Sequence, residues 1–212
     1  MMIQHIFLPS VFTNCYILGD ESTGIGAVID PGAYTDDILN AAKQMGLRLD
    51  YIFLTHGHFD HVGGVPELRK HLPDAKVYLH PADAGKNDEL YPTAACGETI
   101  PWDDGDVVKV GNLEVEVIHT PGHTPGGVTL KCEYALFTGD TLFADSIGRT
   151  DFPGGDYDQI LDSVLRLARL PGDYKVLPGH NGFSTMENER DENDFITEAL
   201  ERADEKALQK TL

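Results

Sequence analysis

The sequence predicts a mixed α/β fold, in which short strands and amphipathic helices alternate along one domain of residues 1–212. Two observations support this fold class. Short apolar runs rich in β-branched and aromatic residues are bounded by glycine and proline turns, and longer segments between some of them carry apolar residues at helical spacing. A hydrophobic content of 41% in 212 residues is sufficient for a substantial core.

The N-terminal segment predicts an antiparallel meander. Residues 3–8, 15–18 and 26–29 are strand-like, and turn-forming residues separate them. Asp30 follows the third of these strands in an Asp-Pro-Gly turn. It is either a simple turn residue or a support for a ligand-bearing loop, and the sequence alone favours neither role.

The next segment alternates helix and strand. Thr35 is a suitable N-cap for a helix that presents one apolar face and stops at Gly46. Residues 51–54 form a strand pattern, a helical pattern starts near Val62 and closes at Pro73, and residues 75–79 return as a strand. This alternation indicates helices lying on a sheet.

Periodicity fades between residues 81 and 101, where polar residues and turn formers predominate. Such a segment is either a lid or binding loop, or an ordinary surface excursion. Beyond it, residues 113–117 alternate apolar and acidic side chains, as expected of a strand with one solvated face. Residues 128–130 and 134–137 then predict a hairpin.

The C-terminal part predicts two more helices. Asp156 can cap a helix whose apolar stripe runs through residues 160–168 and which ends at Pro171. From Glu189 an acidic helical pattern follows, and we expect this helix to lie on the domain. The alternative use of its apolar stripe is a dimer interface, so a monomer or a homodimer is expected.

Charge and composition exclude several classes of partner. The formal net charge is −19 and no basic run occurs, so phosphate backbones and anionic membranes would be repelled. No apolar stretch approaches the roughly twenty residues of a membrane span, and the N-terminus does not resemble a secretion signal. Three isolated cysteines, Cys15, Cys96 and Cys132, favour buried thiols in a reducing cytoplasm over a disulfide framework or a nucleophile.

The stretch Thr-His-Gly-His-Phe-Asp-His at residues 55–61 dominates the functional interpretation. It follows the strand at 51–54, so we expect His56, His58 and Asp60 on one face, with Gly57 leaving space between the two imidazoles. His61 then enters the turn into the helix. A solvated histidine-rich turn is the simple alternative reading of this stretch.

The same pattern recurs at three later strand ends, which argues against a solvated turn. Each of these apolar runs is followed, directly or after a short link, by a glycine and then by a side chain able to bind a metal. The three side chains are His123, Asp140 and His180.

Seven nitrogen and oxygen donors of this kind suit zinc, iron or manganese. A single catalytic zinc needs three protein ligands, so seven predict two divalent metal ions, with zinc as the first expectation. Two metals roughly 3.5 to 4 Å apart can share a hydroxide, so the inferred reaction is hydrolysis by a metal-bridging hydroxide. A thiolate leaves without a strong general acid, and no separate proton donor is evident, which favours a small-molecule thioester over an amide.

Four segments resemble the metallo-β-lactamase superfamily and, within it, the glyoxalase II (hydroxyacylglutathione hydrolase) branch. They are residues 55–61, Thr-Pro-Gly-His-Thr-Pro-Gly at 120–126, Thr-Gly-Asp-Thr-Leu-Phe at 138–143 and Pro-Gly-His at 178–180. Residues 146–156 and 183–190 are most similar to the short bacterial and archaeal proteins of this branch. After residue 180 only a short acidic helix is expected, in place of the helical domain whose basic side chains bind glutathione in the full-length enzymes.

The resemblance implies a four-layer αββα sandwich with the metals at one edge. It also implies a role for every ligand: His56, His58 and His123 hold a first metal, Asp60, His61 and His180 a second, and Asp140 bridges them. Asp60 in such enzymes both binds metal and orients, or accepts a proton from, the attacking water.

Several alternatives remain beside this interpretation. Arg149 is either the ion-pair partner of a neighbouring aspartate, which we favour, or an anchor for a substrate carboxylate. His119 is a candidate support for the nearby His123. The rival functions are a mononuclear-iron persulfide dioxygenase, a lactone or β-lactam hydrolase, and a metal-binding module without catalysis. The complete ligand set argues against the non-catalytic module.

Overall fold

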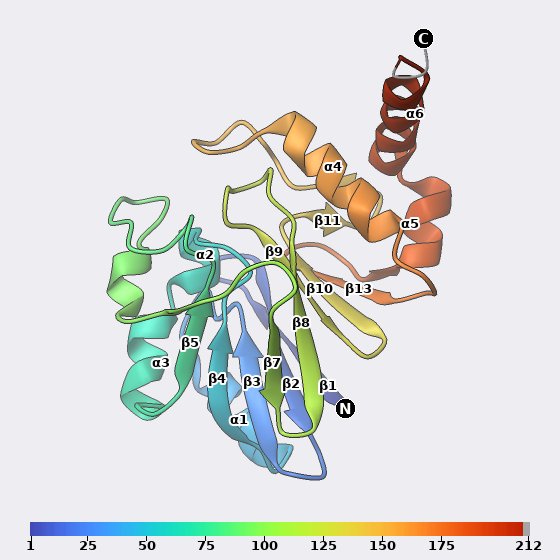
Figure 1. The fold of residues 1–212 in the computed structure, drawn as a ribbon. Helices are drawn as coiled ribbons and strands as arrows, with labels where there is room; N and C mark the ends of the chain where they lie inside the picture. Colours follow the sequence, from blue (N-terminus) through green and yellow to red (C-terminus); the bar gives the residue numbers. More distant parts are fainter. Residues whose placement is uncertain (210–212) are drawn as a thin grey trace.

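The computed structural model describes residues 1–209 and contains two six-stranded β-sheets that face each other, with helices on their outer sides (Figure 1). The strand orders are β1-β2-β3-β4-β5-β6 in the first sheet and β14-β13-β10-β9-β8-β7 in the second. This arrangement confirms the expected αββα sandwich.

The first sheet combines an antiparallel meander with parallel strands. Its strands are β1 (Met2–Leu8), β2 (Thr13–Asp20), β3 (Ile25–Ile29), β4 (Arg48–Phe53), β5 (Lys76–Leu79) and β6 (Ile100–Pro101). The pairs β1–β2 and β2–β3 are antiparallel, as the sequence predicts, and β3 to β6 run parallel. Because β4 and β5 are parallel, their C-terminal ends lie at the same edge of the sheet.

Three helices follow or separate these parallel strands: α1 (Asp36–Gln44), α2 (Phe59–Val62) and α3 (Val65–His71). Thr35 caps α1 by accepting a hydrogen bond from the amide of Asp37. The single helix expected from Val62 is instead divided into α2 and α3 at Gly63 and Gly64. A Cβ atom at either glycine would lie 2.5–2.6 Å from a carbonyl oxygen of the turn at 31–32, so the close approach of that turn explains the division.

The second sheet carries the strands β7 (Val107–Val110), β8 (Leu113–His119), β9 (Val128–Cys132), β10 (Ala135–Gly139), β13 (Lys175–Pro178) and β14 (Ser184–Thr185). The expected hairpin is the antiparallel pair β9–β10, and β10 pairs in parallel with β13. A register shift between Phe137 and Gly139 leaves Thr138 as an extra residue in β10. This β-bulge lies immediately before Asp140.

The outer face of the second sheet is covered by α4 (Tyr157–Ala168), α5 (Met186–Glu192) and α6 (Asp194–Gln209). Asp156 caps α4 by accepting a hydrogen bond from the amide of Gln159 at 2.9 Å, as predicted. The acidic C-terminal segment forms two helices rather than one. Ile196 and Ala199 of α6 are buried, and the C-terminal turns of α6 extend away from the rest of the protein in Figure 1.

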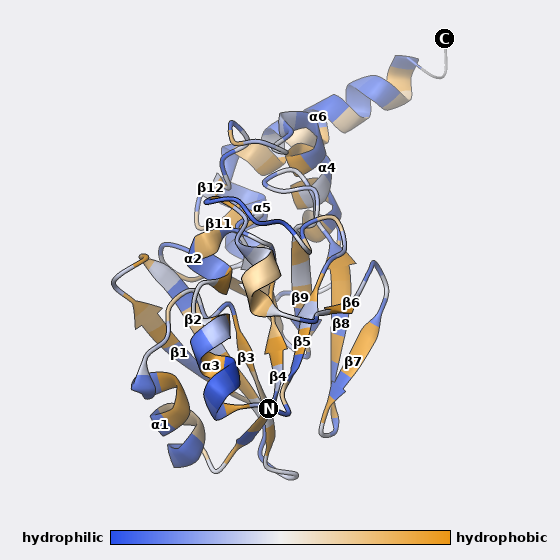
Figure 2. Ribbon diagram, turned by 90° about the vertical axis from the view of Figure 1, so that its left-hand side faces the viewer, coloured by the Kyte–Doolittle hydropathy of each residue, from blue (hydrophilic) through white to orange (hydrophobic). Residues whose placement is uncertain are grey.

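Three apolar layers hold the sandwich together. One lies between α1, α3 and the first sheet, one between the two sheets, and one beneath α4 to α6. Figure 2 shows hydrophobic residues concentrated along the strands of both sheets. Trp102, an isolated aromatic in the sequence, belongs to the layer between the sheets, where its ring centroid lies 5.3 Å from that of Phe53.

The remaining short elements are η1 (Thr93–Cys96), β11 (Leu142–Phe143) and β12 (Ser146–Ile147), of which β11 and β12 pair with each other. Within residues 1–209 no helix is both long and apolar enough to cross a membrane.

Candidate metal centre

Four strand ends deliver the seven predicted ligands to one end of the sandwich. The segment after β4 carries His56 and His58, and the loops after β8, β10 and β13 carry His123, Asp140 and His180. Three overlapping groups have ligand atoms within 4.8 Å of one another, and together they include all seven side chains. These groups are His56–His58–His123, His56–His61–Asp140 and Asp60–His61–His180.

The helix α2, and not an extended strand, places Asp60 and His61. The sequence predicted that Asp60 would continue the alternation of His56 and His58, but the extended backbone ends at His58. The carbonyl oxygen of His58 accepts hydrogen bonds from the amides of His61 at 2.9 Å and Val62 at 3.1 Å. A four-residue helix is too short to produce a recognisable periodic pattern, so the sequence did not reveal it.

The separations between ligand atoms match those around a metal ion. Metal–ligand bonds of about 2.0–2.1 Å in tetrahedral geometry place neighbouring ligand atoms roughly 3.3–3.4 Å apart. Asp140 lies 3.3 Å from His61 Nε2 through Oδ1, and 3.5 Å from His123 Nε2 through Oδ2. His180 Nε2 lies 3.3 Å from Asp60 Oδ2 and 3.4 Å from Asp140 Oδ2.

Unpartnered polar atoms at the centre support the same interpretation. His56 Nε2 is buried and has no hydrogen-bond partner within residues 1–209, and the buried Asp140 Oδ1 makes no hydrogen bond there but lies 3.3 Å from His61 Nε2. Leaving such atoms unsatisfied in a protein interior costs about 1–3 kcal/mol each. A cation between these atoms would satisfy them, so the donor set fits a metal.

Four of the histidines use Nδ1 for a hydrogen bond to a protein oxygen, which leaves Nε2 for the centre. The partners are Thr55 Oγ1 for His56 (3.2 Å), Asp30 Oδ2 for His61 (2.9 Å), the carbonyl oxygen of Arg149 for His123 (2.7 Å) and that of Phe12 for His180 (2.7 Å). Such bonds fix the tautomer and the ring orientation of a metal-binding histidine. In His58 the atom nearest another ligand is Nδ1, 2.9 Å from His123 Nε2.

Asp30 supports the ligand loop, which is the second of the two roles that the sequence allowed. Its Oδ1 accepts the amide hydrogen of Thr55 at 2.8 Å, and its Oδ2 accepts hydrogen bonds from Thr55 Oγ1 at 2.6 Å and His61 Nδ1 at 2.9 Å. Asp30 adopts a left-handed backbone conformation with φ 51°. That conformation is uncommon for a residue other than glycine, and the three hydrogen bonds offset its cost.

Two residues of the segment 81–101 contact the centre and were not predicted. The side chain of Tyr91 is buried, and its ring centroid lies 4.6 Å from that of His58. Its hydroxyl donates to the carbonyl oxygen of Pro153 at 3.1 Å. Asp83 is fully buried and accepts a hydrogen bond from the amide of Gly57 at 3.0 Å. No periodicity or motif in this segment distinguishes these two residues from their polar neighbours.

Glycines let the backbone approach the ligands closely. A Cβ at Gly179 would lie 2.3 Å from Asp140 Oδ1 and 2.5 Å from His61 Cε1. Gly57 has a different role from the predicted one. A Cβ there would lie 2.9 Å from the Cβ of Asp83 and 3.0 Å from Thr93 Cγ2, so the close packing of the segment 81–101, and not space between imidazoles, requires this glycine.

The electrostatics of the metal-free protein divide four of the histidines into two pairs. Burial lowers the pKa of His58 to about 3, and burial together with the neighbouring His61 lowers the pKa of His56 well below its usual value. Burial would also lower the pKa of His180, but hydrogen bonds with Asp140 and Asp60 outweigh burial and raise this pKa to about 10. The pKa of His61 is likewise raised, because the charges of Asp140 and Asp30 overcome burial.

Burial acts in the opposite direction on the two carboxylates. It tends to raise the pKa of Asp60, but the hydrogen bond with His180 and the charge of His61 leave this pKa below its usual value. The pKa of Asp140 is lowered further, since His61 and His180 outweigh its burial. Both carboxylates therefore stay ionised at neutral pH, as metal binding requires.

Arg149 pairs with a neighbouring aspartate, the role that we favoured from the sequence. Its Nε and Nη2 donate to the two carboxylate oxygens of Asp151, each at 2.7 Å, and its guanidinium lies 3.7 Å from the ring centroid of Phe152. His119 supports the loop of His123, since its Nε2 lies 3.0 Å from the carbonyl oxygen of Pro125.

A fourth group of potential ligands, His80, Asp103 and His119, does not have the geometry of a metal site. The rings of His80 and His119 are stacked, with centroids 4.4 Å apart and an angle of 6° between their planes. The lone pairs of an imidazole lie in the plane of its ring. Two stacked parallel rings therefore cannot both direct a nitrogen lone pair at one ion.

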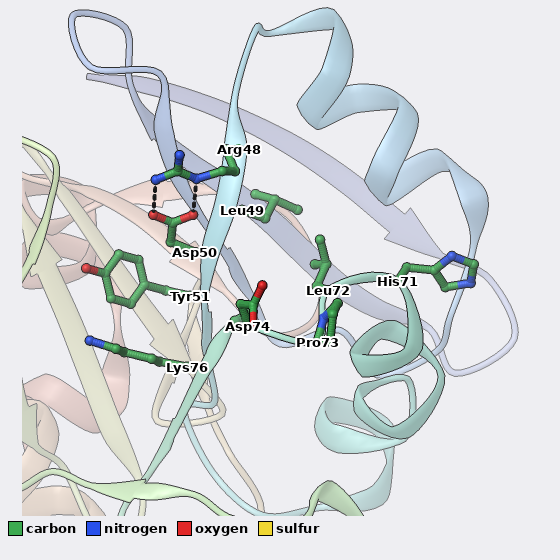
Figure 3. Close-up of a pocket in the computed structure, with 10 residues that line it drawn as sticks. Arg48, Leu49, Asp50, Tyr51, His71, Leu72, Pro73, Asp74 and Lys76 are labelled. Atoms are coloured by element: carbon green, nitrogen blue, oxygen red, sulfur yellow. Dashed lines mark hydrogen bonds and ion pairs between the residues drawn. The ribbon is translucent and has the colours of Figure 1, made fainter.

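A surface cavity of about 490 Å³ lies at the opposite end of the first sheet, where β4 and β5 begin (Figure 3). Arg48 and Asp50 form a two-pronged ion pair beside it, with distances of 2.6 and 2.8 Å, and Tyr51, His71 and Lys76 also line it. Because the predicted ligands follow the other ends of these strands, this cavity does not belong to the metal centre.

Comparison with known proteins gives consistent results. The model of the metallo-beta-lactamase superfamily matches residues 8–180. The chain is 32% identical to hydroxyacylglutathione hydrolase GloC of Haemophilus influenzae, over 92% of this chain and 98% of that protein. It is 34% identical to the mitochondrial persulfide dioxygenase ETHE1 of Homo sapiens, over 95% of this chain and 78% of that protein.

Among solved structures, TTHA1623 in a di-iron-bound form aligns with a TM-score of 0.79 and 33% identity, covering 91% of this chain and 100% of that chain. The range matched by the family model contains all seven candidate ligands, from His56 to His180. The convergence of these side chains identifies a metal-binding His/Asp cluster with a hydrolase-like arrangement. The chain therefore belongs to the metallo-beta-lactamase superfamily, a family of enzymes.

Proposed function

We propose that the chain is a binuclear metallohydrolase that cleaves a small-molecule thioester. The observation that carries this proposal is the position of Asp140. Its Oδ2 lies 3.5 Å from His123 Nε2, and its two oxygens lie 3.3–3.4 Å from the Nε2 atoms of His61 and His180. One carboxylate thus contacts His123, from the group His56–His58–His123, and also His61 and His180, from the group Asp60–His61–His180, as a ligand shared by two metals would.

The donor sets divide into two sites around Asp140. His56, His58 and His123 would hold one metal, Asp60, His61 and His180 would hold the other, and Asp140 would contact both. The donors are mainly imidazoles with two carboxylates, a combination that suits zinc first and also accepts iron or manganese. When bound, two such ions would supply a water activated near neutral pH and positive charge for the carbonyl oxygen of the substrate.

Asp60 is the residue that we assign to proton transfer. Its side chain is 19% exposed, compared with 9% for Asp140, so it is the more accessible of the two carboxylates. It is held in place by His180, whose Nε2 lies 3.3 Å from Oδ2. From this position Asp60 orients the attacking water and accepts its proton.

The surroundings of the centre favour a thioester over an amide. Expulsion of an amine requires a proton donor, whereas a thiolate leaves unassisted because the pKa of a thiol is about 8.5. The tyrosine whose ring packs against a candidate ligand in the described part of the chain is Tyr91, with its centroid 4.6 Å from that of His58. Its hydroxyl donates to the carbonyl oxygen of Pro153, and burial raises its pKa, so it is a poor acid.

The relative that is a hydroxyacylglutathione hydrolase supports this substrate class, and glutathione thioesters are the first compounds to test. The three cysteines are buried and unpaired, which supports our placement of the protein in the reducing cytoplasm. We propose no nucleic-acid or membrane partner, because of the net charge of −19.

A persulfide dioxygenase with one iron is the second candidate, and the similarity to the human enzyme of that name favours it. The two functions differ in the number of metals bound per chain and in the substrates consumed. The test is to measure metals per chain by atomic emission, together with hydrolysis of S-lactoylglutathione and of a shorter acyl thioester. Oxygen uptake with glutathione persulfide is measured on the same preparation.

We expect two metals per chain and chelator-sensitive thioester hydrolysis without oxygen uptake. One iron per chain with oxygen uptake would replace our proposal with the dioxygenase. A chain with two metals that turns over a lactone or β-lactam but no thioester would correct the substrate class. A fully loaded protein without any turnover would instead identify a metal-binding module.

A further inference from the structure

Asp83 is a fully buried carboxylate that lies outside the proposed ligand set. Its Oδ2 accepts a hydrogen bond from the amide of Gly57 at 3.0 Å and from the hydroxyl of Thr124 at 2.7 Å. Its Oδ1 accepts a hydrogen bond from the amide of Gly126 at 3.0 Å. These partners are 26 to 43 residues away in the sequence, so Asp83 links loops that are distant from one another along the chain.

The backbone on two sides packs closely against the Asp83 side chain. A Cβ at Gly57 would lie 2.9 Å from the Cβ of Asp83, and one at Gly126 would lie 2.6 Å from its Cγ. The ammonium group of Lys86 is 3.7 Å from Oδ1. A buried carboxylate is tolerated when it is hydrogen bonded and has a counter-charge nearby, and Asp83 has both.

The partners of Asp83 lie on the two loops that carry the first proposed site. Gly57 separates His56 from His58, and Thr124 directly follows His123. Asp30 instead contacts His61 directly and reaches His56 only through Thr55, whose Oγ1 lies 3.2 Å from His56 Nδ1. Asp83 therefore links the loops of the first site, whereas the ligand that Asp30 contacts directly belongs to the second.

We propose that Asp83 is a positioning residue that fixes the separation of the two loops and thereby sets the metal affinity of the site formed by His56, His58 and His123. This inference rests on the two-site assignment made under the proposed function. It does not depend on which substrate the enzyme cleaves, because it concerns metal binding alone.

The substitution Asp83→Asn tests this role with little change in volume. An asparagine keeps one acceptor oxygen but presents an NH₂ group to at least one of the three donors, so at least one link between the loops is lost. Loss of a group that orients metal ligands typically lowers metal affinity 10–100-fold. We expect a loss of this size for one of the two metal equivalents and no change for the other.

The measurement is a competitive zinc titration against a chromophoric chelator, with wild type and variant compared in the metal-free form first. A cobalt(II) titration adds a spectroscopic signature, because the absorption of the first site should change while that of the second is retained. The matched control is Asp88→Asn. Asp88 is an exposed aspartate of the same segment, which accepts hydrogen bonds from the amides of Leu90 and Tyr91 at 3.0 and 2.8 Å.

Asp30→Asn should show the complementary pattern, with the other equivalent weakened more. If Asp83→Asn does not fold, Thr124→Val removes only the hydroxyl link and should weaken the same equivalent to a smaller extent. Equal weakening of both equivalents, or unchanged binding of both in a folded variant, would overturn the proposal. A protein that binds two metals in this pattern but cleaves no thioester would refute the proposed function and leave the role of Asp83 standing.

Discussion

Replacing Gly179 by alanine tests how strictly the centre depends on the backbone beneath it. The added methyl would lie 2.3 Å from Asp140 Oδ1 and 2.5 Å from His61 Cε1, whereas ordinary contact begins at 3.4 Å. Both ligands would have to move by about 1 Å, and a misplacement of about 1 Å costs on the order of 100-fold in rate. Gly179 does not have a positive φ, so the effect would be steric and not a backbone preference.

The assay measures zinc affinity by chelator competition and kcat with the best thioester substrate. We expect Gly179→Ala to lose 10–100-fold in metal affinity, as is typical when the orientation of metal ligands is disturbed. Gly182→Ala is the matched control, because a Cβ at Gly182 meets nothing within 4 Å. If Gly179→Ala binds zinc and turns over as the wild type does, the inference that residue 179 leaves no room for a methyl group beside the ligands is wrong.

Three further predictions follow from the site. Asp140→Ala should lose both metal equivalents and activity together, since this residue contacts both sets; atomic emission showing two metals retained would contradict this. Arg149→Ala should leave kcat and KM unchanged, because Asp151 already occupies its Nε and Nη2; a raised KM would restore its role as a substrate anchor. In the metal-free protein, the pKa of His180 is raised to about 10, so its stabilisation is complete below about pH 6.5 and is lost as the pH rises towards 10. The Tm measured by circular dichroism should therefore fall across this interval, and a constant Tm would show that the ion pairs do not form.

The sequence predicted that these seven side chains would converge, because the four segments that carry them each follow a strand that is recognisable by itself. Residues 115–118 (Val-Glu-Val-Ile) and 174–177 (Tyr-Lys-Val-Leu) are strand-like stretches with one charged residue each, and each is closely followed by a Gly-His pair; a strand forms at both places in the structure. The helix caps Thr35 and Asp156 were predicted for the same reason, since a cap depends on residues only two or three positions away.

Features that depend on distant partners were not predicted. Asp83 looks like any polar residue of an irregular segment, and only the fold brings it to Gly57 and Gly126. Tyr91 and Trp102 looked isolated in the sequence, yet both are buried by elements far along the chain. The role of Asp30 stayed undecided because a turn residue and a ligand support share the same local sequence.

The extra residue in β10 has a consequence for any attempt to redesign this protein. Thr138 interrupts the alternation of side chains just before Asp140, and its hydroxyl donates to the carbonyl oxygen of Leu142 at 2.7 Å. Deleting it would give a more regular ladder with β13, but every side chain beyond the deletion would change faces. Asp140 would then point away from His61 and His180, so an improvement in strand regularity would remove the contacts of this carboxylate with both histidines.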